Sequence, residues 1–461
     1  MSAIEEVVNK ALACHSAGQK EEATELFERI LEAAPNHPLA LEYLAVRAIR
    51  KKQFPESEAY LTRAIAGGHA RADCYLHLGR LYRDTLSWEA AIENYRNYLE
   101  SQPTNTTALI ELCLALRKVG RLDEAIIAAE RAVETAPGLI EPMCTLASAL
   151  REAGRSAEAT KVWMVAASYN AEDERDKEIK ATALMALGRL DEAVGVADHL
   201  NIMGLENFIG LPRGDDLDKE LTHIPPLIGE QPSQTGSPLL FVGGGVDYVN
   251  RYASELLRSV AVRAPEMAVH IHIVSPNGTA IEDHPLKHVC TETDVTITSE
   301  KAKPDPTYCS TIRFVRLAQI FRHLERPVVA IDIDSLVINP TTDQLKQLIP
   351  FDVALLFRNE QVFVQQQLAA GFVALCPTEN ARRYMDSVAA YISHFLRLGN
   401  ARWFLDQLAL FTAARILSNL KGINIVRAPF NVLDWDQYDE KSLIWTTKGQ
   451  GSTLPPLPNT D

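Results

Sequence analysis

The hydrophobic pattern of this chain changes once, near residue 200. Before that point, small and apolar residues return at a constant step of 34 residues, which predicts a series of paired helices. After Leu239, short apolar runs alternate with amphipathic stretches, which predicts strands and helices in alternation. The segment 203–237 is rich in Pro, Gly and Asp, and we expect a linker that could include one short helix. The pattern therefore predicts two domains, at 1–202 and 238–461.

The step of 34 residues is marked by a recurring phrase, G-x-x-x-E-A. Its glycine is expected to turn the chain between two antiparallel helices, and small residues elsewhere in each unit let these helices approach closely. A proline closes several units because it cannot continue a helix. The glycines are Gly18, Gly120, Gly154 and Gly188, with Lys52 and Leu86 at the steps between, and the prolines are Pro35, Pro103 and Pro137.

This arrangement resembles the tetratricopeptide repeat over about residues 4–202, with five full units and a sixth that is partial. The resemblance implies an all-α superhelix whose concave face binds extended segments or helices of other proteins. An array of this kind can also serve only to support the neighbouring domain or to mediate self-association, because the form of a solenoid does not depend on its ligand.

The second half predicts an α/β domain with a largely parallel sheet covered by helices. The runs PLLFVGG, AVHIHIVSP and PVVAIDID are expected to be strands, and ligands bind at the carboxyl ends of strands in such sheets. Asp332 and Asp334 come at the end of one expected strand, where residues i and i+2 lie on the same face. We therefore expect two neighbouring carboxylates, which suit a hard divalent ion that bridges a diphosphate.

These motifs also have structural explanations. A pair of acids at a strand end often caps the following turn. His270 and His272 share one face of an expected strand, where they could bind a metal or simply pack. The glycines at 243–245 lack the third glycine of a dinucleotide-binding loop, because Tyr248 occupies that position.

Five phrases in order resemble the nucleotide-sugar glycosyltransferases of the GT-A fold, especially the glycogenin-like retaining group. They are FVGGGVDYVNRYASELLRSV, STIRFVRLAQI, PVVAIDIDSLVINP, AAGFVALCP and WFLDQLAL, within about residues 238–450. The resemblance implies transfer of a sugar from a nucleoside diphosphate, such as a UDP-sugar, with retention of configuration. It assigns Asp247 and Tyr248 to the nucleobase and ribose, Arg313 to the donor sugar or its phosphates, Asp332 and Asp334 to Mn²⁺ and the donor, Gly371 to the acceptor side, and Asp406 and Gln407 to the reacting carbon.

The C-terminal part departs from that group. The glycogenin-like enzymes bring a third metal ligand, a histidine, from a segment that also carries a phosphate-binding lysine. In SLIWTTKGQG, Lys448 matches the lysine, but Thr446 and Thr447 stand where the histidine is expected, and no histidine follows His394. Three possibilities stay open: a transferase acting on a protein that the repeats recruit, a transferase acting on glycan or lipid-linked acceptors, and a non-catalytic scaffold with a degenerate transferase domain.

Composition narrows the partners and the compartment. The net charge of −14 comes mostly from residues 1–235, and an acidic surface repels phosphate backbones, so nucleic acid is not expected as a partner and a neutral or basic protein segment is the more natural one. No run approaches the roughly 18 apolar residues of a membrane span, and the first residues do not form a basic leader with an apolar core. We therefore expect a cytoplasmic protein whose seven cysteines are reduced, since none form close-spaced pairs.

Overall fold

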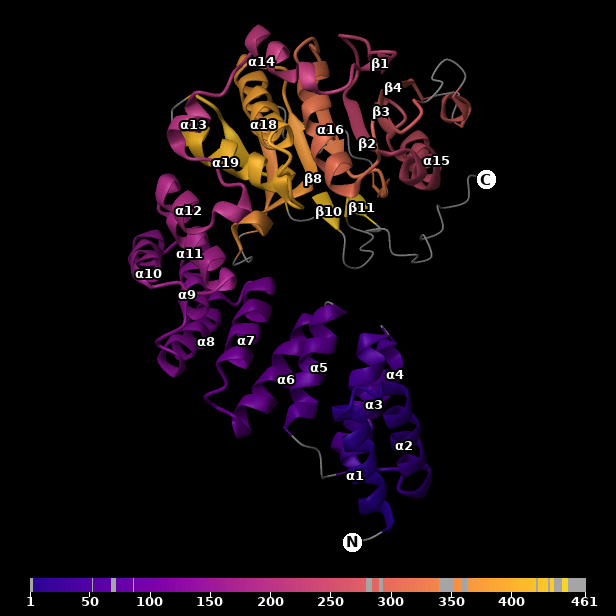
Figure 1. The fold of residues 1–461 in the computed structure, drawn as a ribbon, viewed down its shortest axis with the longest axis vertical. Coiled ribbons are helices and arrows are strands. Elements are labelled where there is room, and N and C mark those ends of the chain that lie inside the picture. The colour runs from indigo at the N-terminus through magenta and orange to yellow at the C-terminus, as the bar shows by residue number, and fades with distance from the viewer. Residues whose placement is uncertain are drawn as a thin grey trace. The chain divides into compact units, whose positions relative to one another are not determined.

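The chain forms two compact units, residues 1–162 and 163–461 (Figure 1). None of the described helices is long and apolar enough to span a membrane. The computed structural model describes residues 3–51, 53–67, 72–85, 87–278, 284–289, 293–339, 351–358, 363–419, 422–429, 432–434 and 442–446.

The first unit consists of antiparallel helix pairs, as the 34-residue step predicts (Figure 1). Gly18, Gly120 and Gly154 follow the first helices of their pairs with φ angles of 79°, 76° and 78°, the left-handed backbone that glycine adopts without strain. The helices are α1 (Ala3–Ser16), α2 (Lys20–Ala33), α3 (Pro38–Arg50), α4 (Phe54–Ala66), α5 (Asp73–Asp84), α6 (Trp88–Ser101), α7 (Thr106–Lys118), α8 (Leu122–Thr135) and α9 (Ile140–Glu152), with α10 (Ser156–Ser168) crossing the unit boundary.

Small residues bring the two helices of a pair together. A Cβ atom on Gly79 of α5 would lie 2.5 Å from Cε1 of Tyr95 on α6, so this approach requires glycine. The first helices of successive pairs also contact each other, α3 with α5 and α7 with α9. The side of the stack that the first helices line is called here the first-helix surface.

The last predicted helix pair belongs to the second unit. It consists of α11 (Glu174–Ala186) and α12 (Leu190–Val196), and Gly188 turns the chain between them. Thr182 on α11 accepts a hydrogen bond from the backbone N–H of Val364 at 2.9 Å. The predicted boundary at residue 202 thus differs from the boundary of the compact units, because this pair packs on the sheet-containing part of the chain.

The segment 203–237, expected to be a linker, is folded. It forms α13 (Leu205–Ile209), α14 (Asp215–Glu220) and β1 (Ile228–Gly229), and it buries Phe208 and Leu217. Asp218 on α14 accepts a hydrogen bond from Arg322 at 2.6 Å. The segment therefore resembles a linker only in its composition. Its buried apolar side chains and its ion pairs hold it against the rest of the second unit.

A mixed sheet forms the centre of the second unit, and the described residues contribute eight strands to it in the order β1-β4-β3-β2-β5-β8-β7-β9. β4, β3, β2 and β5 run parallel, but β8 is antiparallel to β5 and β7, so the sheet is less parallel than predicted. A small second sheet joins β10, β11 and β6. The strands are β2 (Leu239–Gly245), β3 (Ala268–Ser275), β4 (Val295–Lys301), β5 (Val328–Ile331), β6 (Ser335–Val337), β7 (Val353–Phe357), β8 (Leu368–Leu375), β9 (Ile425–Arg427), β10 (Leu433–Asp434) and β11 (Ile444–Thr446).

Helices cover both faces of β2. A Cβ atom on Gly243 would meet Arg313 of α16 (Pro306–Phe321), whereas a Cβ atom on Gly244 would meet Val249 of α15 (Val246–Arg263). Because neighbouring strand residues point to opposite faces, α15 and α16 lie on opposite sides of the sheet. α16 packs in turn against α18 (Glu379–Arg397) and α19 (Leu405–Asn419).

His270 and His272 belong to the core of the sheet. Both side chains are buried, and they bond to the hydroxyls of Thr296 and Thr298 on β4 at 2.8 to 3.1 Å. Burial lowers the pKa of His270 to about 3, so its ring is neutral. This arrangement matches the structural explanation of the pair, not the metal site.

Candidate functional site

The predicted acidic pair lies in the turn between β5 and β6, at the carboxyl end of the parallel strands. β5 ends at Ile331, so the alternation of a strand does not align the two acids, and that part of the expectation is wrong. Asp332 instead bonds to Arg313 of α16, and Asp334 bonds to Tyr248 of α15. Each carboxylate thus has a partner on a different helix.

Asp332 and Arg313 form an ion pair at the edge of the sheet. Arg313 donates from Nη1 to Asp332 and from Nη2 to the carbonyl oxygen of Ala370 at 3.2 Å. The Arg313 side chain is 10% exposed, while the Asp332 side chain is 34% exposed. The carboxylate therefore reaches solvent, and the guanidinium is held behind it as a fixed positive charge.

Gly371 makes room for this carboxylate. A Cβ atom on Gly371 would lie 2.8 Å from Oδ2 of Asp332 and 3.0 Å from Cδ2 of Leu433. The resemblance to the glycosyltransferases predicts Gly371 on the acceptor side. In the structure its nearest functional neighbour is Asp332, so its first role is to let β8 pass beside the acidic turn.

Asp334 is the more buried acid of the pair, and it is bonded to a tyrosine. The Tyr248 hydroxyl donates to Oδ2 of Asp334 at 2.7 Å, and Asp334 is 5% exposed. Burial and the negative charge of Asp334 raise the pKa of Tyr248, so the phenol keeps the proton that it donates. Asp247, the neighbouring predicted donor-binding residue, is exposed in the first turn of α15.

Asp406 joins the same cluster from the first turn of α19. Its Oδ2 lies 3.7 Å from Nη2 of Arg313, which therefore lies between Asp406 and Asp332. Burial raises the pKa of Asp406 to about 6, although the charge of Arg313 opposes this shift. α19 follows Phe404, whose φ of 73° is strained for a bulky side chain, and such strain is common at functional sites.

The Gln407 side chain is hydrogen-bonded to backbone carbonyl oxygens. With its amide nitrogen turned toward two carbonyl oxygens, it donates to Gln365 at 3.0 Å and to Leu368 at 2.6 Å. Leu368 begins β8, the strand that carries Gly371. Gln407 therefore fastens β8 to α19, and its predicted contact with the reacting carbon stays a prediction.

The C-terminal strand β11 reaches the acidic turn. It pairs antiparallel with β6, so that Thr446 lies opposite Ser335, and their hydroxyls are 2.6 Å apart. The resemblance expects a histidine ligand in this segment, but Thr446 is 2% exposed and its hydroxyl is already bonded. Lys448 lies outside the described residues.

The two acids alone do not complete a metal site. No three His, Cys, Asp or Glu side chains within the described ranges gather where they could hold an ion. Asp332 and Asp334 supply oxygen ligands of the kind that Mn²⁺ prefers, but no third His, Cys, Asp or Glu among the described residues joins them. If an ion binds here, other oxygen groups, such as water, would have to supply the remaining ligands.

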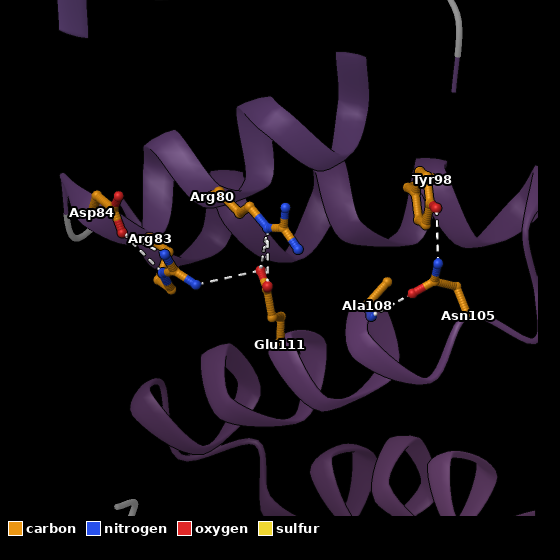
Figure 2. Close-up of polar contacts among 7 residues, drawn as sticks. All are labelled: Arg80, Arg83, Asp84, Tyr98, Asn105, Ala108 and Glu111. Carbon is orange, nitrogen blue, oxygen red and sulfur yellow. Dashed lines mark hydrogen bonds and ion pairs between the residues drawn. The ribbon is translucent and has the colours of Figure 1, made fainter. Parts of the chain in front are cut away.

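A second polar cluster lies on the first-helix surface of the repeats (Figure 2). Glu111 of α7 is 8% exposed and accepts hydrogen bonds from Nε of Arg80 at 3.0 and 3.3 Å. Nη1 of Arg83, on the next turn of α5, lies 3.4 Å from the same carboxylate. The sequence pattern did not lead to a prediction of this cluster. A charged residue at a repeat position that is apolar in the neighbouring units would have indicated it.

Asn105 fixes the helix that carries Glu111 (Figure 2). Its Oδ1 accepts a hydrogen bond from the backbone N–H of Ala108 at 2.9 Å, which caps α7, and its Nδ2 donates to the Tyr98 hydroxyl at 3.0 Å. The start of α7 is thereby tied to α6. Glu111 consequently faces α5 from a rigid support.

Comparison with known proteins bears on the first unit. A model of the tetratricopeptide repeat family matches residues 9–73 and 76–140. Among solved structures, MamA is 18% identical over 41% of this chain and 94% of its own, with a TM-score of 0.33. YrrB, described as a TPR protein with an unusual peptide-binding site, is 18% identical over 41% of this chain and 84% of its own, with a TM-score of 0.32.

Likeness at this level carries no argument about function, and no curated protein matches the chain. The assignment of the first unit rests on the family model and on the observed helix pairs, which agree in position. The N-terminal region of the chain, including residues 9–140, therefore consists of tetratricopeptide repeats.

Proposed function

We propose that this chain is a protein-interaction scaffold, in which the first-helix surface binds a segment of another protein. The observation that carries the proposal is the match of residues 9–140 to the repeat family, together with helix pairs in the same register. Stacked pairs of this kind expose an extended surface that needs no further domain to bind a partner. The second unit then serves as a folded neighbour, whether or not it retains chemistry.

Site-directed photo-cross-linking tests this proposal in cells that express the full chain. A cross-linking amino acid at Leu114 would report partners on the first-helix surface, because Leu114 is the repeat equivalent of Arg80. The control position is Ile127 on the second helix α8, which is 56% exposed. We expect a discrete protein adduct from Leu114 and none from Ile127, and adducts from Ile127 alone would refute the proposed surface.

A second candidate function is metal-dependent sugar transfer from a UDP-sugar to a protein that the repeats recruit. It is favoured by one observation: Arg313 lies between Asp332 and Asp406 at the carboxyl ends of the strands. A departing diphosphate gains negative charge, so a fixed cation and a metal-binding acid pair are what such a step needs. When bound, Mn²⁺ would neutralise that charge, with Asp332 and Asp334 as its protein ligands.

Two features support the alternative of a degenerate transferase domain. Thr446 replaces the expected histidine ligand, and the Gln407 amide is engaged by backbone carbonyls. A screen of nucleotide sugars with Mn²⁺, scored by thermal stabilisation, separates the two cases. A nucleotide sugar at about 100 times its dissociation constant should stabilise the fold by roughly 2.7 kcal/mol. If no nucleotide sugar raises the melting temperature, only the scaffold function remains supported.

A further inference from the structure

The turn before β8 connects the last helix pair of the repeats to the candidate site. This turn is the 3₁₀ helix η4 (Val364–Gln366), and one residue separates it from β8, the strand that carries Gly371. It contacts α11 and also α19, the helix that carries Asp406 and Gln407. All of these elements belong to the second compact unit. The turn is therefore placed between α11 and two of the elements that build the acidic cluster.

Two side chains of α11 hold this turn. Oγ1 of Thr182 accepts a hydrogen bond from the backbone N–H of Val364 at 2.9 Å. Oε2 of Glu178 accepts one from the side-chain amide of Gln365 at 3.2 Å. Residues four apart lie on one face of a helix, so both bonds come from the same side of α11. The second oxygen of Glu178 lies 3.3 Å from Nε2 of His199, which orders the carboxylate.

Glu178 differs from its equivalents in the repeat array. The residues at the same position one and two units earlier are Cys144 and Ile110, which are buried and apolar. Contact between successive repeats therefore does not need a carboxylate at this position. Because a hydrogen bond requires a partner in a particular direction, whereas apolar packing does not, the acid gives α11 a specific hold on Gln365.

The same turn is held from α19 by Gln407. Its side-chain amide donates to the carbonyl oxygen of Gln365 at 3.0 Å, and its backbone N–H donates to Oδ1 of Asp406 at 2.9 Å. The other oxygen of Asp406 lies 3.7 Å from Nη2 of Arg313. Gln365 thus contacts α19 through its carbonyl group and α11 through its side chain. A continuous chain of polar contacts therefore runs from Glu178 to the guanidinium of Arg313.

We propose that Glu178 and Thr182 are positioning residues through which the last helix pair of the repeats controls the candidate site. They hold η4, and η4 holds the start of α19 through Gln407, so that Asp406 stays beside Arg313. Movement of α11 would release this chain of contacts, because each member is a direct neighbour of the next. The inference goes beyond the scaffold function, since it needs neither a partner on the repeats nor a reaction at the site.

Hydrogen exchange of the full chain, read by mass spectrometry, tests the proposal. Thr182→Val and Glu178→Ala remove the two acceptors on α11. Thr182→Ser and Glu178→Gln each keep an oxygen that can accept the same bond, and they serve as matched controls. Glu174→Ala controls for loss of an exposed acid from the first turn of α11. The amides of β3, in the centre of the sheet, report whether the second unit stays folded.

We expect Thr182→Val and Glu178→Ala to raise the exchange rates of residues 405–410 at least about fivefold, since the start of α19 loses its support. The rates of β3 should not change. Thr182→Ser, Glu178→Gln and Glu174→Ala should exchange like the unchanged chain.

The ionisation of Asp406 gives a readout that a purely structural contact would not move. Burial raises the pKa of this carboxyl from 3.8 to about 6, so a loosened α19 that admits water should shift the pKa back toward 3.8. The shift is read from the pH dependence of unfolding of Glu178→Ala, compared with the same variant that also carries Asp406→Asn.

Two results would overturn the proposal. One is faster exchange confined to α11 and η4 together with an unmoved pKa of Asp406. The other is unchanged exchange at residues 405–410 in both Thr182→Val and Glu178→Ala. Either result would leave the scaffold function standing, because that function rests on the repeats of the first unit.

Discussion

Gly371 lies so close to Asp332 that a Cβ atom on the glycine would be 2.8 Å from the carboxylate oxygen Oδ2. The same carboxylate accepts a hydrogen bond from Arg313. The strand that carries Gly371 therefore sets where Asp332, and through it Arg313, lies at the candidate site.

Gly371→Ala should displace Asp332 from Arg313. The added methyl has no space between Asp332 and Leu433, so we expect the free energy of unfolding to fall by about 1–3 kcal/mol. Urea denaturation measures the change. The matched control is Gly138→Ala, where a Cβ atom would meet nothing within 4 Å and an effect of about 0.5 kcal/mol or less is expected. Equal stability of the two variants would contradict the close approach.

Asp406→Asn should stabilise the fold at pH 7. The folded-state pKa of Asp406 is raised from 3.8 to about 6, so the folded state binds this proton more tightly than the unfolded state. The free energy of unfolding then falls as the pH rises from about 4 to about 6, and the cost above pH 6 is up to about 3 kcal/mol.

An uncharged amide at position 406 removes that cost. The variant should match the unchanged chain near pH 4 and exceed its stability at pH 7, as measured by denaturation across this range. Asp123→Asn, at an exposed position on α8, is the control for a simple loss of charge. A variant that is less stable than the unchanged chain at pH 7 would contradict this prediction. It would show that the ion pair of the Asp406 carboxylate with Arg313 stabilises the fold more than burial of the charge destabilises it.

Gln407→Ala should loosen the start of β8. The variant loses the hydrogen bonds that the Gln407 side-chain amide donates to the carbonyl oxygens of Gln365 and Leu368. Backbone amides of residues 364–370 should therefore exchange with deuterium faster. Hydrogen exchange read by mass spectrometry measures this directly. If the exchange rates stay the same and only sugar transfer slows, Gln407 acts at the reacting carbon, as the resemblance to the glycosyltransferases predicts.

Asp334→Ala should abolish metal-dependent nucleotide binding if the second unit binds a donor. The prediction concerns UDP in the presence of Mn²⁺, measured by titration calorimetry on the folded variant. Tyr248→Phe removes the hydroxyl that now bonds to Asp334 and should weaken binding less, since the carboxylate remains. Glu255→Ala, which removes a partly exposed acid of α15, should bind normally. Unchanged binding in Asp334→Ala would remove the metal assignment.

A chain of residues 163–461 should be more stable than one of residues 203–461. The shorter chain lacks α11, whose Thr182 bonds to Val364 and whose Ala186 carbonyl accepts a hydrogen bond from Arg415 at 3.0 Å. Thermal unfolding of the two chains measures the difference. Equal melting temperatures would support the boundary near residue 202 that the hydrophobic pattern predicts.

The sequence was sufficient to predict the repeats. Each helix pair is defined by contacts within one or two units, and the same small residues recur every 34 positions, so local pattern and fold agree. Gly120 and Gly154 illustrate this, because each has the left-handed backbone that its place in the repeat requires. The strands of the second unit could likewise be predicted from the sequence, because buried strands appear as apolar runs.

Tertiary structure alone decided how the candidate site is assembled. Asp334 and Tyr248 are 86 residues apart in sequence, and whether they bond depends on which helix covers which face of the sheet. The antiparallel β8 brings Gly371 to Asp332, and no local pattern specifies the order of the strands. The ion pair of Arg80 with Glu111 has the same origin, because Glu111 lies on the next helix pair and only the stacking of the repeats turns it toward Arg80. The sequence by itself therefore determined the helices, the strands and the residues able to do chemistry, whereas long-range packing determined which of them meet.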